Sequence, residues 1–223
     1  MNKLIIVGNG KLATAIQNQL PAYLRIETIP YTPEVPADSD PVFVHVGSGR
    51  QYSESLNLAI SCGASYVQAA TGKEFPMEPP AEAAIRYIHA PNLDLSIIRL
   101  FHLLKTAGDL FHGEPVTITE SHQKEKQSTP GTAVKFCDYL NLPWERIVSI
   151  RDPLVQKELG IRNTGHHAFH RIAIGDEHSK ITIETSVEGA TGYVRGLARI
   201  VQCLPNLDVG RYEVEDLVAL KLL

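Results

Sequence analysis

The sequence of 223 residues predicts an α/β protein with an N-terminal Rossmann-type, doubly wound parallel sheet and a second, α+β domain with a mixed sheet. Over the first 93 residues, short apolar runs alternate with helical patterns, and glycine-bearing turns separate them. Such alternation is typical of βαβ units and parallel sheets. After residue 93, strands follow one another without regular intervening helices, which indicates a domain of another kind.

The first half begins with an apolar run from Leu4 to Val7, which ends at a glycine and fits a buried parallel strand. Residues 11–20 then carry apolar side chains at helical spacing. The further elements expected in this half are strands at 24–29, 42–46, 65–69 and 87–89, and helices at 53–62 and 81–86.

The second half begins with a long amphipathic helix expected at 96–111. Ile181 and Ile183 alternate with polar residues, which favours an antiparallel or mixed sheet. The further elements expected are strands at 115–120, 147–150, 168–174 and 180–186, and helices at 132–140, 194–203 and 214–220. The C-terminal segment is expected to return to the first domain, so the predicted domains are 1–93 with 196–223, and 94–195.

Composition and charge disfavour several classes of protein. The formal net charge is −4, so a nucleic-acid partner is not expected, although a local pocket can still bind a small anion. Cys62, Cys137 and Cys203 are far apart and lack metal-ligand spacing, which predicts reduced thiols and a cytoplasmic protein. The N-terminus lacks the apolar region of a signal peptide, and no apolar run is long enough to predict a membrane helix.

The segment GNGKLA, residues 8–13, directly follows the first expected strand and opens a helix. Such a loop lets a pyrophosphate approach bare backbone and presents the free N–H groups of the helix start. In this context the segment predicts nucleotide binding rather than an ordinary strand-to-helix turn. The residues expected to bind the nucleotide are Gly8, Asn9, Gly10, Lys11 and Leu12.

Three later loops follow expected strands, at the edge of the sheet where a dinucleotide lies. Ordinary turns are the alternative for each loop. The residues expected to line the nicotinamide half are Gly47, Ser48, Gly49, Ala70, Thr71, Gly72, Ala90, Pro91 and Asn92. The choice between NAD and NADP stays open, because Glu27, Arg25 and Lys11 are each weak candidates for contacts with the adenosine ribose or its phosphate.

The stretch ESHQKEKQSTPGTA, residues 120–133, combines a histidine and a lysine with a turn that opens a helix. Taken alone, it could be a solvated charged loop. Together with the other motifs it resembles the family of 4-hydroxy-tetrahydrodipicolinate reductases (dihydrodipicolinate reductases). The resembling segments, in chain order, are the glycine loop GNGKL, ATG at 70–72, APNLD at 90–94, ESHQKEKQSTPGTA, GHH at 165–167 and the C-terminal RYEVEDLVAL.

The resemblance implies that 1–93 and 196–223 bind the dinucleotide and that 94–195 bind the substrate and form a homo-oligomer, a tetramer or a dimer. It implies hydride transfer from NADPH or NADH to a small cyclic dicarboxylate in lysine and diaminopimelate biosynthesis. His122 would donate or position the proton, since the unperturbed pKa of a histidine side chain suits general acid catalysis. Lys126 would hold a carboxylate or share the proton transfer. Gln123, Gly131 and Thr132 would bind the substrate, the last two at the start of a helix.

The chain also departs from the family pattern. Gln123 stands where the family has a second histidine, Ser128 where it has an aspartate, and the P-S-G-T-A segment is one residue shorter. A later arginine of the family, which would bind a substrate carboxylate, aligns near Ala190 and is missing in this chain. Two alternatives therefore stay open: a reductase of the same fold that acts on another cyclic imine or unsaturated acid, and an inactive NAD(P)-binding sensor or scaffold.

Several histidines raise the question of a metal. On a continuous strand, His166, His170 and His178 would share one face, and His167 the other. Since no cysteine or acid completes a tetrahedral set at standard spacing, no metal is predicted. His167 matches the histidine of the family's G-E-H segment, which implies a structural or substrate-side role.

Overall fold

The structure is a computed structural model, and it describes residues 2–34, 40–47, 49–70, 79–125 and 130–223. The chain divides into two compact units: Met1–Leu95 with Tyr193–Leu223, and Ser96–Gly192. Each unit is described by itself. None of the described helices is both long and apolar enough to cross a membrane.

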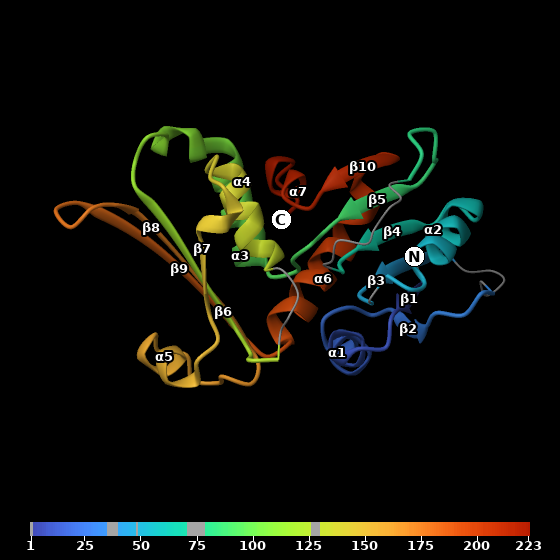
Figure 1. The fold of residues 1–223 in the computed structure, drawn as a ribbon. Coiled ribbons are helices and arrows are strands. Elements are labelled where there is room, and N and C mark those ends of the chain that lie inside the picture. The colour runs from blue at the N-terminus through green and yellow to red at the C-terminus, as the bar shows by residue number, and fades with distance from the viewer. Residues whose placement is uncertain (1, 35–39, 48, 71–78, 126–129) are drawn as a thin grey trace. The chain divides into compact units, whose positions relative to one another are not determined.

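The first unit contains a six-stranded sheet with the order β10-β5-β4-β3-β1-β2, and every neighbouring pair is parallel. The strands are β1 (Lys3–Val7), β2 (Glu27–Pro30), β3 (Pro41–His45), β4 (Ser65–Gln68), β5 (Arg86–His89) and β10 (Gly210–Glu213). The predicted doubly wound parallel sheet is confirmed. Near the C-terminal end of the chain, β10 joins the sheet beside β5 (Figure 1).

The first unit also contains four α-helices and two 3-10 turns among its described residues. They are α1 (Lys11–Gln19), α2 (Tyr52–Ser61), α6 (Thr191–Cys203), α7 (Asp216–Ala219) and the 3-10 turns η1 (Leu20–Ala22) and η4 (Leu204–Asn206). Right-handed crossovers carry α1 and α2 to opposite faces of the sheet, because the chain moves in opposite directions from β1 to β2 and from β3 to β4. α6 packs closely against Leu93, because a Cβ at Gly196 would overlap the carbonyl oxygen of Leu93.

Tyrosine hydroxyl groups in the core of this unit bond to one another. The rings of Phe43, Tyr66 and Tyr87, from three adjacent strands, stack with centroids 6.2 and 5.8 Å apart. Tyr52 and Tyr87 share a hydroxyl–hydroxyl bond of 2.8 Å, and Tyr66 bonds Ser55 at 2.9 Å. A buried hydroxyl without a partner costs free energy, so these bonds allow tyrosine to fill positions that also suit phenylalanine.

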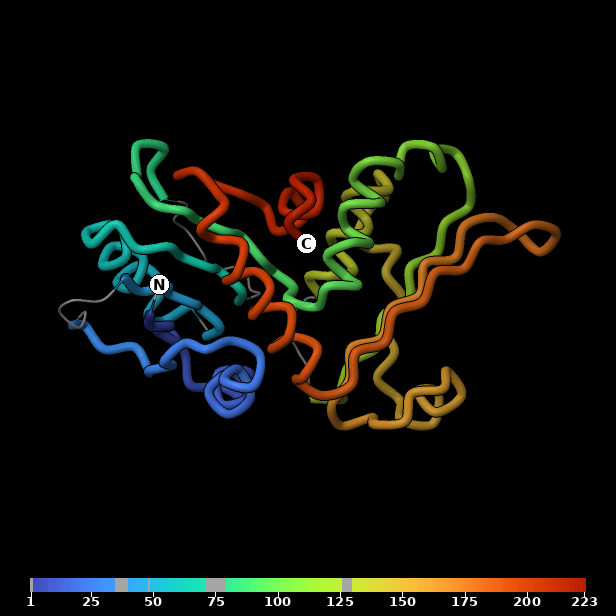
Figure 2. The backbone as a smooth tube through the Cα atoms, turned by 180° about the vertical axis from the view of Figure 1, so that it is seen from behind, coloured from blue at the N-terminus to red at the C-terminus, as the bar shows by residue number. Residues whose placement is uncertain are grey.

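The second unit has a mixed four-stranded sheet with the order β7-β6-β8-β9. Its strands are β6 (Val116–His122), β7 (Ile147–Ile150), β8 (His167–Gly175) and β9 (Lys180–Glu188). β6 and β7 are parallel, whereas β6–β8 and β8–β9 are antiparallel, as predicted for a mixed sheet. The backbone trace shows β8 and β9 as a long hairpin (Figure 2).

Helices cover one face of this sheet (Figure 1). They are α3 (Leu95–Ala107) and α4 (Gly131–Tyr139); the other helical segments are α5 (Pro153–Glu158), η2 (Gly108–Phe111) and η3 (Trp144–Arg146). Phe101 of α3 meets Phe136 of α4 with ring centroids 5.5 Å apart, and Phe136 meets His170 of β8 at 5.7 Å. α4 therefore packs on the face that carries the even-numbered residues of β6 and β8.

Some sequence predictions of local structure are wrong. Residues 81–86 do not form a helix, because the N–H of Ala83 closes a turn onto Pro80 and Ile85 is already buried just before β5 begins at Arg86. The second strand begins at Glu27 rather than at residue 24, because Leu24 still bonds back to Leu20 in a helical turn. The prediction also missed α5 and β10, which are short elements with little hydrophobic periodicity.

Candidate functional site

The sheet of the first unit has its topological switch point between β1 and β3, which lie side by side although the chain leaves them toward opposite edges. Ligands of open α/β sheets bind at the carboxyl ends of the strands at such a point. Gly8 follows β1 with φ +131°, and a Cβ there would lie 2.8 Å from Cα of Gly47, after β3. Only glycine allows these two loops to touch.

A pocket of about 330 Å³ opens at this point, lined by Gly8, Asn9, His45, Gly47, Arg50 and Gln51. Three of these residues are among those predicted to bind the cofactor. Sequence analysis missed His45, whose position at the end of an apolar strand carries no signal of function. The Oε1 atom of Gln68 accepts the N–H of Ala70 at 3.1 Å and lies 2.8 Å from Nδ1 of His45.

The bond to Gln68 determines the tautomer of His45. Since Oε1 of Gln68 can only accept, Nδ1 of His45 is the donor. Burial lowers the pKa of His45, and the bond to Gln68 offsets this only in part. The ring is therefore neutral at pH 7, and its Nε2 atom carries a lone pair.

The start of α1 can accept an anion. Gly10 is its N-cap, with φ −80°, no side-chain cap and no acid in the first turn. A Cβ at Gly10 would have no heavy atom within 4 Å, so the protein's own packing does not require glycine there. Gly10 and Lys11 are exposed, and Leu12 is partly exposed. This arrangement fits a dinucleotide phosphate, which needs close approach to free N–H groups.

The other residues predicted to bind cofactor lie at strand ends. Ala70 follows β4. Ala90 follows β5, and its N–H donates to the carbonyl of Gln68. Gly49, with φ +90°, precedes α2, and Pro91 follows Ala90. The side chain of Asn92 accepts the N–H of Asp94 at 2.8 Å. Ser48, Thr71 and Gly72 lie outside the described residues.

Glu27 is not at the carboxyl end of β2. It is the first residue of β2, pairs in register with Lys3 and forms an exposed ion pair with it. The adenosine ribose of a Rossmann cofactor lies at the opposite, carboxyl end of this strand. Glu27 is therefore excluded as its partner.

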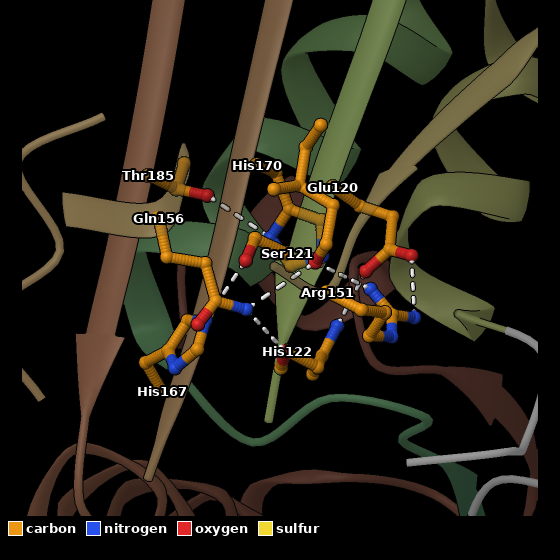
Figure 3. A network of polar contacts seen from close by, with 9 residues as sticks. Glu120, Ser121, His122, Arg151, Gln156, His167, His170 and Thr185 are labelled. Carbon is orange, nitrogen blue, oxygen red and sulfur yellow. Dashed lines mark hydrogen bonds and ion pairs between the residues drawn. The ribbon is translucent and has the colours of Figure 1, made fainter. Parts of the chain in front are cut away.

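In the second unit, His122 is the last residue of β6 and belongs to a polar network (Figure 3). Glu120 lies two residues earlier on the same face of the strand. Its carboxylate is 2.6 Å from Nδ1 of His122 through Oε2, and 2.7 Å from Nη2 of Arg151 through Oε1. The Glu120 side chain is fully buried, whereas that of His122 is 13% exposed.

The surroundings of Glu120 keep it ionised. Burial alone would raise the pKa of the carboxyl group, but hydrogen bonds from His122, Arg151 and Ser149 together lower it to about 2. A carboxylate can only accept hydrogen bonds, so Nδ1 of His122 is the donor. This leaves Nε2 of His122 as the nitrogen that can exchange a proton with a ligand.

The main chain of His122 is also fixed. Gln156, buried on α5, donates from Nε2 to the carbonyl of His122 at 2.9 Å. The ring of His170 meets that of His122 edge-on, with centroids 5.6 Å apart. The N-cap of α5 is Asp152, whose side chain accepts the N–H of Leu154, and Pro153 is in the first helical position.

The remaining histidines do not form a metal site. His167 lies on the other face of the sheet, where its Nε2 is 2.9 Å from the hydroxyl of Ser121. Burial lowers the pKa of His167. His178 lies in the turn after β8, so the expected common face with His166 and His170 is wrong. In the part of the chain that the structure describes, no three His, Cys, Asp or Glu residues converge as metal ligands do.

The predicted substrate-binding residues occupy two places in the second unit. Gln123 directly follows β6, next to His122. Gly131 and Thr132 form the first turn of α4, whose N-cap, Pro130, supplies no side-chain cap. Lys126 lies outside the described residues.

Sequence analysis missed Glu120, Arg151 and Gln156. The period of two along a strand could have linked Glu120 to His122, since both residues are in one short segment. Arg151 and Gln156 have no such local signal, because only the pairing of β6 with β7 and the docking of α5 bring them to His122.

Comparisons with known proteins agree with this architecture. Residues 96–218 match the family model described as dihydrodipicolinate reductase, C-terminus. A 4-hydroxy-tetrahydrodipicolinate reductase from Rickettsia akari (strain Hartford) is 23% identical over 175 residues, which cover 73% of this chain and 70% of the relative. A protein of the same name from Janthinobacterium sp. (strain Marseille) is 23% identical over 185 residues, which cover 77% of this chain and 68% of that relative.

Solved structures share the fold. A dipicolinate-bound dihydrodipicolinate reductase from Paenisporosarcina sp. TG-14 has a TM-score of 0.70 at 17% identity, covering 97% of this chain and 99% of that one. A meso-DAPDH mutant from Clostridium tetani E88, solved with DAP, has a TM-score of 0.56 at 12% identity, with 100% and 96% covered. Because the family model spans more than half of the sequence, the chain belongs to the dihydrodipicolinate reductase family, a family of NAD(P)-dependent oxidoreductases.

Proposed function

We propose that the protein reduces 4-hydroxy-tetrahydrodipicolinate to tetrahydrodipicolinate, with NADPH or NADH, in lysine and diaminopimelate biosynthesis. The observation that carries the proposal is the fixed orientation of His122 at the end of β6, held by the buried carboxylate of Glu120. The names of the relatives and the dipicolinate bound to the Paenisporosarcina enzyme support a small dicarboxylate as the substrate.

The cofactor supplies hydride when bound, and the chain's own residues supply its binding site. The pocket at Gly8 and Gly47 and the uncapped start of α1 fit a dinucleotide. Gly8, Asn9, Gly10, Lys11 and Leu12 would hold the phosphates. Gly47, Gly49, Ala70, Ala90, Pro91 and Asn92 would line the nicotinamide half; the sequence assigns Ser48, Thr71 and Gly72 to the same half, and these lie outside the described residues.

His122 provides the proton that must follow hydride addition. A hydride added to one atom of a conjugated system leaves charge at a neighbouring atom, which then takes a proton. Protonated on both nitrogens, the ring gives up the proton on Nε2 and keeps Nδ1–H on Glu120. The carboxylates of the substrate bind Lys126, Gln123 and the N–H groups of Gly131 and Thr132 at the start of α4.

Turnover tests this proposal directly. The measurement is oxidation of NADH and of NADPH by the purified protein, with the substrate generated in the assay. His122→Ala should then lower the rate by about 10²- to 10⁴-fold, because it removes the proton donor. Cofactor binding without turnover of this substrate or of other cyclic imines would instead indicate a sensor. Turnover with only another cyclic imine would change the substrate, as the replacement of the second histidine by Gln123 allows.

The wider setting follows the same proposal. Cys62, Cys137 and Cys203 are free thiols, which suits the reducing cytoplasm. A homo-oligomer, dimer or tetramer, would form through the face of the mixed sheet opposite α4. Val148 is on that face, where its side chain is 45% exposed.

A further inference from the structure

The carboxylate of Glu120 joins two cationic or proton-donating side chains in the interior of the second unit (Figure 3). One oxygen faces Nδ1 of His122 at 2.6 Å, and the other faces Nη2 of Arg151 at 2.7 Å. The proposed reaction needs only a proton donor at position 122, so it does not by itself account for this pair of contacts.

A buried carboxylate is costly unless it is paired and hydrogen-bonded. Both oxygens of Glu120 are used, so the group stays an acceptor and holds the imidazole with its proton on Nδ1. A freely rotating histidine would present either nitrogen in either tautomer. The contact with Glu120 selects a single orientation and a single tautomer.

The sheet register explains how Arg151 reaches Glu120. β7 runs parallel to β6 with Ile150 opposite Ser121, so Arg151 lies level with His122 and its side chain turns back to the carboxylate. Gln156 holds the His122 carbonyl from α5. Glu120 and Arg151 thus restrain the side chain of His122, and Gln156 of α5 restrains its main chain.

We propose that Glu120 and Arg151 are positioning residues, which hold His122 with Nδ1 protonated and Nε2 presented to the substrate. The inference rests on the proposed function for the reaction that His122 serves. The tautomer of His122 does not depend on the proposed function, because it follows from the contact with Glu120. The reaction itself is unchanged: the proton leaves from Nε2, and neither Glu120 nor Arg151 touches the substrate.

The first test replaces Glu120 by glutamine, which keeps the shape and removes the charge. Nitrogen NMR of labelled protein reports which ring nitrogen of neutral His122 carries the proton. We expect Nδ1–H in the wild type and a mixture of tautomers in Glu120→Gln, because the amide can donate to Nδ1 as well as accept from it. The turnover number should fall about 10²-fold or more, as for loss of the carboxylate partner of a catalytic histidine. KM for the cofactor should not change.

A second variant guards against misfolding. Arg151 is partly exposed, so Arg151→Met should fold, leave Glu120 less firmly held and lower turnover less than Glu120→Gln does. Arg151→Lys should restore part of the loss. Glu27→Gln is the matched control: it removes a carboxylate from an exposed ion pair in the first unit and should change neither tautomer nor turnover.

The outcomes separate the two proposals. Unchanged turnover and an unchanged Nδ1–H tautomer in Glu120→Gln would overturn the positioning role and leave Glu120 a structural residue. If the wild type shows no turnover but Glu120→Gln still shows the expected change of tautomer, the proposed substrate is refuted and the positioning role stands. A wild type with Nε2–H in its neutral form would overturn the positioning role outright.

Discussion

Glu120 illustrates how single contacts set the ionisation of a buried group. Its pKa is about 2 in the folded protein, below the ordinary value of 4.5, because three hydrogen bonds outweigh the opposing effect of burial. A group with a depressed folded pKa contributes stability above its unfolded pKa, and that contribution is lost as the pH falls toward the folded pKa. The carboxyl group of Glu120 therefore links stability to acid pH.

The free energy of unfolding should fall more steeply in the wild type than in Glu120→Gln between about pH 4.5 and pH 2. At pH 7 the variant should be less stable by about 2 kcal/mol, the cost of a lost hydrogen bond to a charged group. Denaturant unfolding at a series of pH values measures both. Parallel curves for the two proteins would contradict the linkage.

Residues at the carboxyl end of β2 bear on the choice between NADH and NADPH. Tyr31 follows β2 at its carboxyl end, and with Glu54 it lines a pocket of about 520 Å³. Burial raises the pKa of Tyr31, and the neighbouring charge of Glu54 raises it further. Glu54, rather than Glu27, is thus the acid beside the carboxyl end of β2, the end at which Rossmann folds bind the adenosine ribose.

Glu54→Gln should strengthen binding of NADPH and leave binding of NADH nearly unchanged, because the wild-type carboxylate repels a 2′-phosphate. Exposed charge pairs contribute up to about 1 kcal/mol, so the gain should not exceed about fivefold. Fluorescence titration of both reduced cofactors measures the ratio of their Kd values. An equal change for both cofactors would show that Glu54 does not face the ribose.

At the scale of elements, the loops after β1 and β3 place two glycines under different constraints. Gly8 has a positive φ and no room for a Cβ beside Gly47, so the fold itself requires glycine. Gly10 has an ordinary φ and open space around it. The requirement for glycine at position 10 would come from a ligand that approaches the start of α1.

The two glycines therefore make a matched pair of alanine variants. Gly8→Ala should lower the free energy of unfolding by about 2 kcal/mol or more, since it combines a strained φ with a steric clash. Gly10→Ala should cost about 1 kcal/mol or less as a changed N-cap, yet weaken cofactor binding strongly. Thermal unfolding with and without NADPH measures both effects. Unweakened cofactor binding by Gly10→Ala would remove α1 from the cofactor site.

At the scale of the whole molecule, the chain forms two units, each with its own sheet and core. In the second unit, α3 and α4 cover one face of the sheet, and alternation along β7 directs Val148 to the other face. The interface proposed above, between copies of the chain, would bury the partly exposed side chain of Val148.

Light scattering should report a mass of two or four times 24.6 kDa. Val148→Asp should shift the protein toward the monomer, because a charge would be buried at the interface. Leu110→Asp is the control, since Leu110 is 82% exposed and lies in η2, outside the sheet. A monomeric wild type would refute the oligomer. An unchanged mass for Val148→Asp would show that Val148 is not part of the interface.

Local patterns in the sequence determined the parallel and mixed sheets, the glycine loop and the place of His122 at a strand end, because periodicity and turn chemistry act over a few neighbouring residues. Tertiary structure decided what lies far apart in the chain. The contact of Gly8 with Gly47, the pairing of β10 with β5 and the reach of Arg151 to Glu120 each depend on sheet pairing, to which many residues contribute small energies. Residues 81–86 show the same limit, since burial of Ile85 just before β5 outweighed a weak local helical pattern.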